Sequence, residues 1–156
     1  MYSVVTVTGQ AEWRQFLAMP RRVYHRRHAA IPLPAFEVRR LLDRANSPAL
    51  QGRALWLLLV RRDDQPVGRC SLLLPREHDG TPALFGFFEC VNDQRAADAL
   101  LTHVEEICAA HGVTAVHGPF SPDTAGLTGV QLDHFDDANV LGEPCALPLY
   151  RRLVEG

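Results

Sequence analysis

Several features that would assign a function class directly are missing from this sequence of 156 residues. No apolar run approaches the ~18 residues that a membrane span needs. The first residues, MYSVVTVTGQAEW, lack the basic and apolar regions of a signal peptide. The four cysteines are widely spaced and form no CxxC pair. The sequence therefore predicts a protein of a reducing, cytoplasmic compartment that has no membrane partner.

The chain also lacks a strong excess of positive or negative charge. The chain has 16 basic and 18 acidic residues, a formal net charge of -2, and it lacks the interleaved aromatics of a nucleic-acid platform. The segment QLDHFDD contains Asp133, His134, Asp136 and Asp137, but their spacing matches neither an EF-hand nor a zinc motif. There is no Walker loop, Ser-His-Asp order or paired-carboxylate glycosidase pattern. We therefore predict no nucleic-acid partner and no metal.

The composition is that of an ordinary globular protein, with 47% hydrophobic and 22% charged residues. Its length favours a single domain over residues 1–156. Three of the cysteines lie inside apolar or helical patterns, so we expect them to be buried free thiols.

Apolar periodicity predicts a mixed order of strands and helices. The expected strands are 3–9, 54–60, 67–74, 83–91 and 113–120. The expected helices are 11–28 with a break or kink at Pro20, 36–45, 94–110 and 145–156. Residues 61–66 are expected to form a hairpin turn, and residues 121–144 a long irregular segment. This order predicts an α/β (α+β) fold, a mixed central sheet with helices on both faces.

Residues 85–117 read as strand, turn, helix and strand, the order of a phosphate-binding unit, yet the turn VNDQRAAD contains no glycine. Glycines in such a turn let successive amides approach a phosphate at the positive end of a helix. Arg95 adds a side chain there and has less freedom to adopt a positive φ. Its guanidinium could instead donate charge-assisted hydrogen bonds to phosphate.

Three phrases together resemble the Gcn5-related N-acetyltransferase (GNAT) superfamily over nearly the whole chain: PVGRCSLLL, FFECVNDQRAADALLTHVEEICAAHGV and ALPLYRRLVEG. The sequence is most similar to an uncharacterised GNAT-like subgroup. That likeness rests on GR at 68–69, GFFE at 86–89, ALL at 99–101, HG at 111–112, GPF at 118–120 and AGLTGVQLDHFD at 125–136. The resemblance implies a GNAT-like sheet.

The resemblance also implies acetyl-CoA or another acyl-CoA as co-substrate, with its pyrophosphate at Asn92–Ala97. The loop motif is degenerate here, because its first position is Asn92, its middle glycine is Arg95, and only Ala97 satisfies the pattern. The implied cofactor-binding residues are Cys90, Val91, Asn92, Gln94, Arg95, Ala96 and Ala97.

Three residues are implied to be catalytic. Tyr150 matches the tyrosine that protonates the leaving thiolate, and Glu89 or His117 could accept a proton from an incoming amine. Each also has a structural alternative: Tyr150 could pack between helix and sheet, Glu89 could be an ordinary strand-end carboxylate, and His117 could be a hydrogen-bonded core histidine.

GNAT domains usually continue past the tyrosine helix into two more strands, which this chain lacks. Either the sequence is a piece of a longer chain, or a homodimer, an exchanged element or a partner domain covers the open sheet edge.

The sequence predicts an N-acyltransferase that moves an acyl group from acyl-CoA to a small-molecule amine. An alternative stays open, namely a non-catalytic GNAT-like module that binds a ligand or a partner and has lost acyl-CoA binding. An enzyme of different chemistry in the same cleft is a third possibility, because fold does not fix function.

Overall fold

The computed structural model describes residues 1–25, 30–77, 79–122, 127–144 and 146–156. Among these residues, five strands form the main sheet in the order in which they occur in the chain. They are β1 (Tyr2–Thr6), β2 (Arg53–Arg62), β3 (Gln65–Pro75), β4 (Ala83–Cys90) and β5 (Val116–His117). Neighbours from β1 to β4 are antiparallel, and β5 pairs parallel with β4. The predicted mixed sheet is confirmed.

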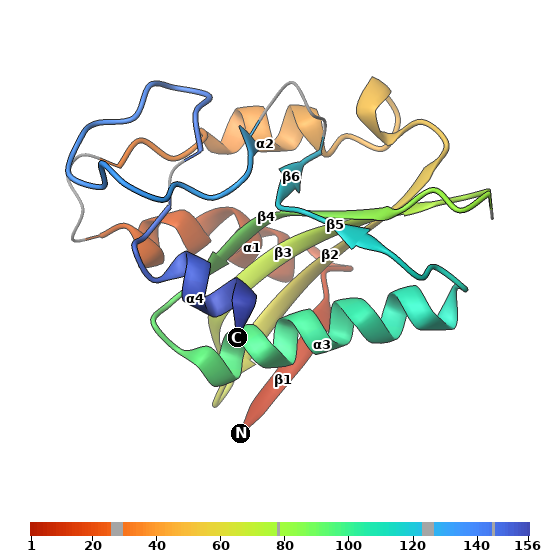
Figure 1. Cartoon of the computed structure of the whole chain (residues 1–156), viewed down its shortest axis with the longest axis horizontal. Coiled ribbons are helices and arrows are strands. Elements are labelled where there is room, and N and C mark those ends of the chain that lie inside the picture. The colour runs from red at the N-terminus through yellow and green to blue at the C-terminus, as the bar shows by residue number, and fades with distance from the viewer. Residues whose placement is uncertain (26–29, 78, 123–126, 145) are drawn as a thin grey trace.

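Helices cover both faces of this sheet (Figure 1). Two lie on one face: α1 (Gln10–Val23) and α2 (Ala35–Leu41), which meet where Arg39 lies over the Trp13 ring. The long helix α3 (Gln94–Ala110) covers the other face, and α4 (Tyr150–Glu155) packs against α3. The remaining elements are a short 3-10 helix, η1 (Pro48–Leu50), and a small second sheet of β6 (Phe120–Ser121) and β7 (Leu127–Thr128).

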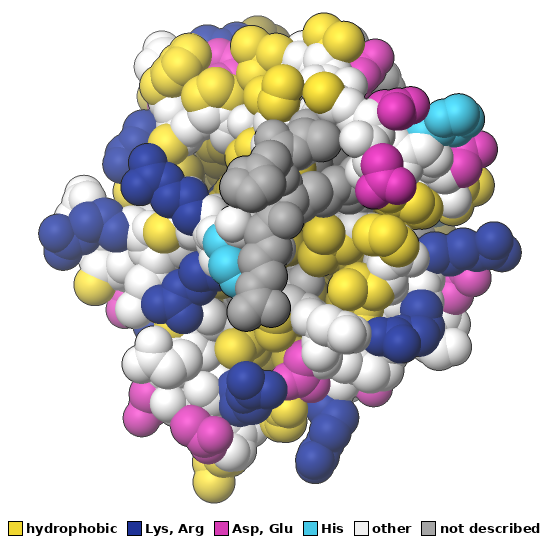
Figure 2. Space-filling model, turned by 90° about the vertical axis from the view of Figure 1, so that its left-hand side faces the viewer, with side chains coloured by type: hydrophobic (Ala, Val, Ile, Leu, Met, Phe, Trp, Pro, Cys, Tyr) yellow, Lys and Arg dark blue, Asp and Glu magenta, His cyan; other side chains and the backbone are white. Residues whose placement is uncertain are grey.

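One side of the molecule brings together α4, the turn between β4 and α3, and the chain that leads to α4 (Figure 1). Figure 2 views this side. Hydrophobic side chains lie across its top and centre, and several acidic side chains lie at the upper right. Basic side chains are spread over the left, the bottom and the right. This surface is therefore mixed in charge and partly apolar around the site described below.

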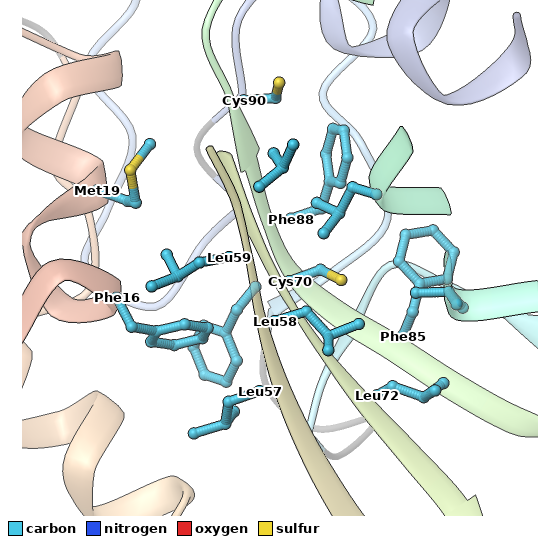
Figure 3. Packing of buried hydrophobic residues seen from close by; sticks show 14 of the residues in the cluster. Phe16, Met19, Leu57, Leu58, Leu59, Cys70, Leu72, Phe85, Phe88 and Cys90 are labelled. Carbon is cyan, nitrogen blue, oxygen red and sulfur yellow. The ribbon is translucent and has the colours of Figure 1, made fainter. Parts of the chain in front are cut away.

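Alternate residues of the central strands build the two halves of the core. Leu57 and Leu59 of β2 point toward Phe16 and Met19 of α1, whereas Leu58 points to the opposite side with Cys70 and Leu72 of β3 (Figure 3). Successive strand side chains face opposite ways, so apolar residues at consecutive positions indicate a strand buried on both faces.

The β2–β3 hairpin is tighter than expected. The sequence predicted a turn over residues 61–66, but the strands continue to Arg62 and from Gln65. Asp63 and Asp64 form the turn with φ values of 49° and 63°. Two positive φ values are typical of a type I′ turn, whose twist matches that of the flanking strands.

The sequence predicts a break or kink at Pro20. A break is wrong, because α1 continues through Pro20 to Val23. A prolyl nitrogen carries no hydrogen, so it cannot donate to the Phe16 carbonyl one turn earlier. That carbonyl instead accepts a hydrogen bond from Arg69 Nη1 at 2.6 Å. Arg69 of β3 thus replaces the hydrogen-bond donor that the helix lacks at Pro20.

Strand β4 contains a β-bulge. Ser71 pairs with Gly86 and Arg69 pairs with Glu89, so Phe87 and Phe88 together oppose Cys70. Phe87 adopts a φ of 47°, a left-handed conformation that costs about 1–3 kcal/mol in a non-glycine residue. Bulges of this kind bend a strand and redirect its side chains.

The parallel pairing of β4 and β5 ends early. It covers only Ala83 with Val116 and Leu84 with His117. Gly118 follows, a weak strand former, and then Pro119, which has no N–H to donate to a ladder. The predicted strand 113–120 is therefore divided into β5 and β6. Beyond Leu84, β4 is separated from β5, and β6 lies beside Gly86.

Other boundaries are shorter than expected. The predicted helix 36–45 ends at Leu41, and the helix predicted over 145–156 begins at Tyr150. Helix α3 matches its prediction at both ends, Gln94 and Ala110. Residues 26–28 and Cys145, also predicted to be helical, lie outside the described residues.

We predict that Gly86→Ala destabilises the fold by at least about 1–3 kcal/mol, the usual cost of overpacking. A Cβ at Gly86 would lie 1.8 Å from the Phe120 carbonyl oxygen, which is rigid backbone. Urea denaturation measures the loss. The control is Gly9→Ala, where only the flexible Glu12 carboxylate must move and the expected cost is below about 1 kcal/mol. Equal losses in the two variants would contradict the close packing of β6 on β4.

Candidate active site

A small cavity lies where β4 separates from β5. Its volume is about 60 Å³. Its lining comes from β3, β4, β6, α4 and four loop segments: Pro32, Leu33, Arg69, Phe87, Phe88, Glu89, Pro119, Ser121, Gly129, Val130, Glu143, Pro144, Ala146 and Tyr150. Glu89 and Tyr150, two of the predicted catalytic residues, therefore face the same space.

Glu89 is held by a buried ion pair. Arg69 Nε lies 2.5 Å from Glu89 Oε2, and the two side chains are only 2% and 10% exposed. Burial raises the pKa of Glu89, and the Arg69 charge and hydrogen bond oppose that rise. The carboxylate keeps a second oxygen for a partner in the cavity.

Arg69 is itself fixed from several directions. Besides Glu89, it donates to the Phe16 carbonyl, and its guanidinium lies 4.6 Å from the Phe16 ring centroid and 5.7 Å from that of Phe87. The stacked rings and the helix carbonyl compensate a cation that has been removed from water. Helix α1 thus positions Glu89 through Arg69.

The Tyr150 hydroxyl is buried in the same region. It accepts hydrogen bonds from the Cys90 amide at 3.3 Å and from the Tyr24 hydroxyl at 3.5 Å, and its ring packs edge-on against Phe88. Burial, followed by the nearby Glu89 charge, raises the pKa of Tyr150 well above its ordinary value. The Cys90 amide can only donate, so this bond does not use the phenolic proton of Tyr150.

Ser121 of β6 binds the backbone of the bulge in β4. Its hydroxyl accepts a hydrogen bond from the Phe87 amide at 2.8 Å, and the residue is 3% exposed. The bulge has turned this amide away from β3 and toward the gap between the strands. It is a backbone donor that points to the place where a carbonyl oxygen could bind.

His117 lies elsewhere. Its side chain is exposed on β5, and it is not among the residues that line the cavity. The proposed basic role of His117 stays a sequence-based prediction.

The turn before α3 needs no glycine. No residue from Asn92 to Ala97 has a positive φ, and Arg95 lies inside the helix with its guanidinium 5.5 Å from the Tyr2 ring centroid. The expected conflict between Arg95 and a positive φ does not arise, because the helix begins at Gln94 without a left-handed residue.

Asp93 caps α3 instead. Its carboxylate accepts from the Ala96 amide at 3.3 Å and from the Tyr2 hydroxyl at 2.8 Å, and it pairs with Arg62 at 2.8 Å. Partial burial would raise its pKa, but these hydrogen bonds and the Arg62 charge together lower it. An acidic N-cap is favourable for the helix.

The predicted cofactor-binding residues divide into two groups. The amides of Val91, Ala96 and Ala97 are already bonded to backbone carbonyls, and the Cys90 amide is bonded to Tyr150. By contrast, the amides of Gln94 and Arg95 make no hydrogen bond to any described residue. Asn92 contacts α4, because its Oδ1 accepts from Arg152 Nη2 at 2.6 Å.

This donor set fits a diphosphate group. Arg62, Arg95 and Arg152 supply three positive charges around the turn, against the carboxylates of Asp93 and of Asp98, which is held by Gln94. Two unpaired amides and two arginines not bound to a carboxylate remain for an anion. The acid cap uses part of the positive end of the helix, so arginine side chains would carry more of the binding than glycine amides do.

Asn139 joins two loop segments near the cavity. Its side-chain amide bonds both backbone groups of Ile31, Ile31 N to Oδ1 at 2.8 Å and Nδ2 to Ile31 O at 3.0 Å. Two segments distant in sequence are thereby joined beside Pro32 and Leu33 on one wall and Glu143 on the other.

Within the described parts of the chain, no group of three His, Cys, Asp or Glu residues could hold a metal ion. None of the described helices is both long and apolar enough to cross a membrane. Cys70, Cys90 and Cys108 are free and buried, as expected.

Sequence reasoning missed Arg69, Ser121 and Asn139. A single arginine inside the apolar phrase PVGRCSLLL was a signal for Arg69, because a charge at a buried strand position requires a partner. Ser121 and Asn139 carried no such signal, since both lie in polar, irregular sequence.

The comparisons with known proteins concern the fold. No family model matches the sequence, and no curated protein is significantly similar to it. Among solved structures, a tandem GNAT protein from the clavulanic acid biosynthesis pathway matches with a TM-score of 0.55 and 21% identity over 74% of this chain. The match spans only 35% of that protein's length.

Two other solved structures match at lower scores. An aminoglycoside acetyltransferase from an uncultured soil metagenomic sample, in complex with sisomicin, has a TM-score of 0.49 and 11% identity over 76% of this chain and 77% of its own. A Trypanosoma brucei acetyltransferase has a TM-score of 0.46 and 19% identity over 75% and 81% of the two chains. The topology and the tandem protein together show that this chain has a GNAT-like fold.

The Arg69–Glu89 pair should be strongly coupled. Arg69→Met and Glu89→Met each leave a buried charge unpaired, so each should cost about 3–5 kcal/mol of unfolding free energy, and the double variant should lose clearly less than the sum. Urea denaturation of all four proteins measures the coupling. The exposed pair Arg151–Glu155 is the matched control, with an expected coupling below about 0.5 kcal/mol. Additive losses at Arg69 and Glu89 would contradict the buried pair.

Tyr150 should contribute to stability in alkali. Its folded-state pKa is raised, so its contribution is present below the unfolded-state pKa of about 10 and is lost as pH rises above it. Wild type should lose up to about 1.4 kcal/mol more per pH unit than Tyr150→Phe between about pH 10 and 11. Denaturation curves at several pH values measure the slopes. Parallel slopes would show that the hydroxyl ionises equally easily in the folded state.

Proposed function

We propose that this protein is an N-acyltransferase that moves an acyl group from acyl-CoA to a small-molecule amine. The observation that carries the proposal is the bulge at Phe87–Phe88, which opens β4 and leaves Glu89, the Phe87 amide and Tyr150 around one cavity. A base, a carbonyl-binding donor and a proton donor are thus combined in a GNAT-like scaffold.

Each side chain has a role that follows from its surroundings. Glu89 accepts a proton as the amine nitrogen forms its bond to the acyl carbon. The Phe87 amide, released from Ser121, donates to the carbonyl oxygen on which negative charge develops. Tyr150 gives its phenolic proton to the departing sulfur as the carbon–sulfur bond breaks, and it regains a proton from solvent. The products are an amide and a free thiol.

The co-substrate supplies an activated acyl thioester. Its diphosphate would be held by Arg95, Arg152 and the amides of Gln94 and Arg95. Its pantetheine arm would lie along the open edge of β4 at Cys90. Catalysis would then depend mainly on holding two substrates in register.

The partner of the sheet edge stays a proposal. β5 is bonded to β4 on one side only among the described strands, and an apolar groove lined by Leu101, Val104, Val113 and Val116 runs along it. We propose that a second copy or a partner domain covers this edge. The single domain over residues 1–156 and the cytoplasmic location also stay proposals from the sequence.

The first test is binding of CoA to the purified protein by thermal denaturation and calorimetry. Millimolar CoA should raise the unfolding midpoint, because a ligand of the native state stabilises it by mass action. Arg95→Glu should remove the shift, whereas Arg21→Glu, an exposed charge reversal on α1, should keep it. A wild-type protein whose midpoint does not respond to CoA would favour the non-catalytic module.

The second measurement is acyl transfer to an amine panel from acetyl-CoA. Glu89→Gln should lower kcat by about 10²–10⁴, the range for a general base, with CoA binding retained. Transfer that persists at the wild-type rate in Glu89→Gln would assign the basic role elsewhere.

A further inference from the structure

One end of β2 has an open edge, because β2 is longer than β1. Strand β1 pairs with β2 only over residues 58–62, and the Val7 amide adds one more hydrogen bond, to the Leu57 carbonyl at 2.8 Å. The chain then turns into α1 at Gln10. Residues 53–56 of β2 therefore have no neighbouring strand on that side among the described strands.

The backbone of Leu55 faces this open edge. In an antiparallel pair, alternate residues turn both N–H and C=O toward the same neighbour. Because the Leu57 carbonyl faces β1, the N–H and C=O of Leu55 face the same side. The carbonyl accepts from Arg44 Nη2 at 2.7 Å, whereas the amide donates to no described residue.

The Leu55 amide therefore needs an acceptor from elsewhere. Leu55 is only 5% exposed, and buried amides without an acceptor are rare in native proteins. The acceptor must come from solvent or from a ligand that lies along the edge of β2.

A groove runs along this edge. Its described lining residues come from the start of α1, the end of α2 and β2: Val7, Thr8, Gly9, Gln10, Trp13, Arg39, Leu42, Asp43, Arg44, Leu55 and Leu57. None of them lines the cavity at Glu89. The groove is therefore a separate site.

Two arginines of the groove are oriented without a carboxylate. The Arg39 guanidinium lies 5.7 Å from the centroid of the Trp13 ring, and Arg44 is held by the Leu55 carbonyl. Neither arginine forms an ion pair with a described residue. A guanidinium over an aromatic face keeps N–H groups at its edge for a further acceptor.

Asp43 does not occupy these arginines. It is the single acidic residue among the described lining residues. One of its carboxylate oxygens accepts from the Ala45 amide at 2.9 Å, and the other accepts from Asn46 Nδ2 at 2.8 Å. The carboxylate is thus bonded within the segment that follows α2, and the two guanidinium groups remain for a ligand.

We propose that this groove binds an extended acidic peptide segment of another protein. The Leu55 amide donates to a carbonyl of the peptide backbone, and Arg39 and Arg44 bind its carboxylate side chains. Two separate features agree on this ligand, because an unpaired strand-edge amide requires a carbonyl and the guanidinium groups require an anion. A peptide that lies along a free sheet edge can supply both.

The test uses two blocked pentapeptides, Val-Glu-Val-Glu-Val and Val-Gln-Val-Gln-Val, and the isotope-labelled full chain without CoA. In an extended peptide both Glu side chains lie on one face. Amide-shift NMR should show about tenfold tighter binding of the Glu peptide, the range for two partly exposed ion pairs. The Leu55 amide proton should shift downfield and exchange more slowly with solvent. Succinate should bind more weakly and leave the Leu55 signal in place.

Arg39→Gln removes one of the two charges. It should weaken binding of the Glu peptide by about threefold to fivefold and leave binding of the Gln peptide unchanged. Arg40→Gln is the matched control, since Arg40 is the next residue of α2, is exposed, pairs with Glu37 and does not line the groove. It should change neither affinity.

Four outcomes would overturn the inference. They are no binding of either peptide, equal affinity for the two peptides, full affinity for the Glu peptide in Arg39→Gln, and a Leu55 shift with succinate as large as that with the Glu peptide. The last would make the groove a site for small anions. These measurements omit CoA and use a separate site, so their outcome is independent of the proposed acyl transfer.

Discussion

The buried pair of Arg69 and Glu89 is the interaction on which the site depends. Two charges removed from water are stable only with close geometry and further partners. Here the partners come from three elements: β3 carries Arg69, β4 carries Glu89, and α1 supplies the Phe16 carbonyl and ring. Any shift of α1 on the sheet would leave a charge without its partner, so the pair fixes how helix and strands meet.

Pro20 explains why α1 can serve this purpose. In a regular helix the Phe16 carbonyl would be bonded by the amide of residue 20, and only the absent proline N–H leaves it free for Arg69. A residue that looks like a helix breaker in the sequence therefore provides an acceptor for a buried cation. The bulge in β4 acts at the other end of the pair, because it sets the register that places Glu89 opposite Arg69.

The turn before α3 differs from a glycine-rich loop in the groups that it offers to an anion. Asp93 caps the helix and Arg62 compensates its charge, while Arg95 and Arg152 stand on either side of two unbonded amides. Arg152 belongs to the helix that begins with Tyr150, and its bond to Asn92 ties that helix to the turn. Tyr150 and the turn before α3 are thus connected through α4.

The sequence by itself determined the elements with strong local signals: α3 to both ends, the β2–β3 hairpin, the mixed sheet and the buried cysteines. It also identified Glu89 and Tyr150 through a resemblance in short phrases. Only the tertiary structure decided that these two share a cavity while His117 does not line it, that the Phe16 carbonyl accepts from Arg69, and that Asn139 bonds the backbone of Ile31. Periodicity reports which face of an element is apolar. Partners such as Arg69 and Phe16 are far apart in the chain and meet only after the helices pack on the sheet.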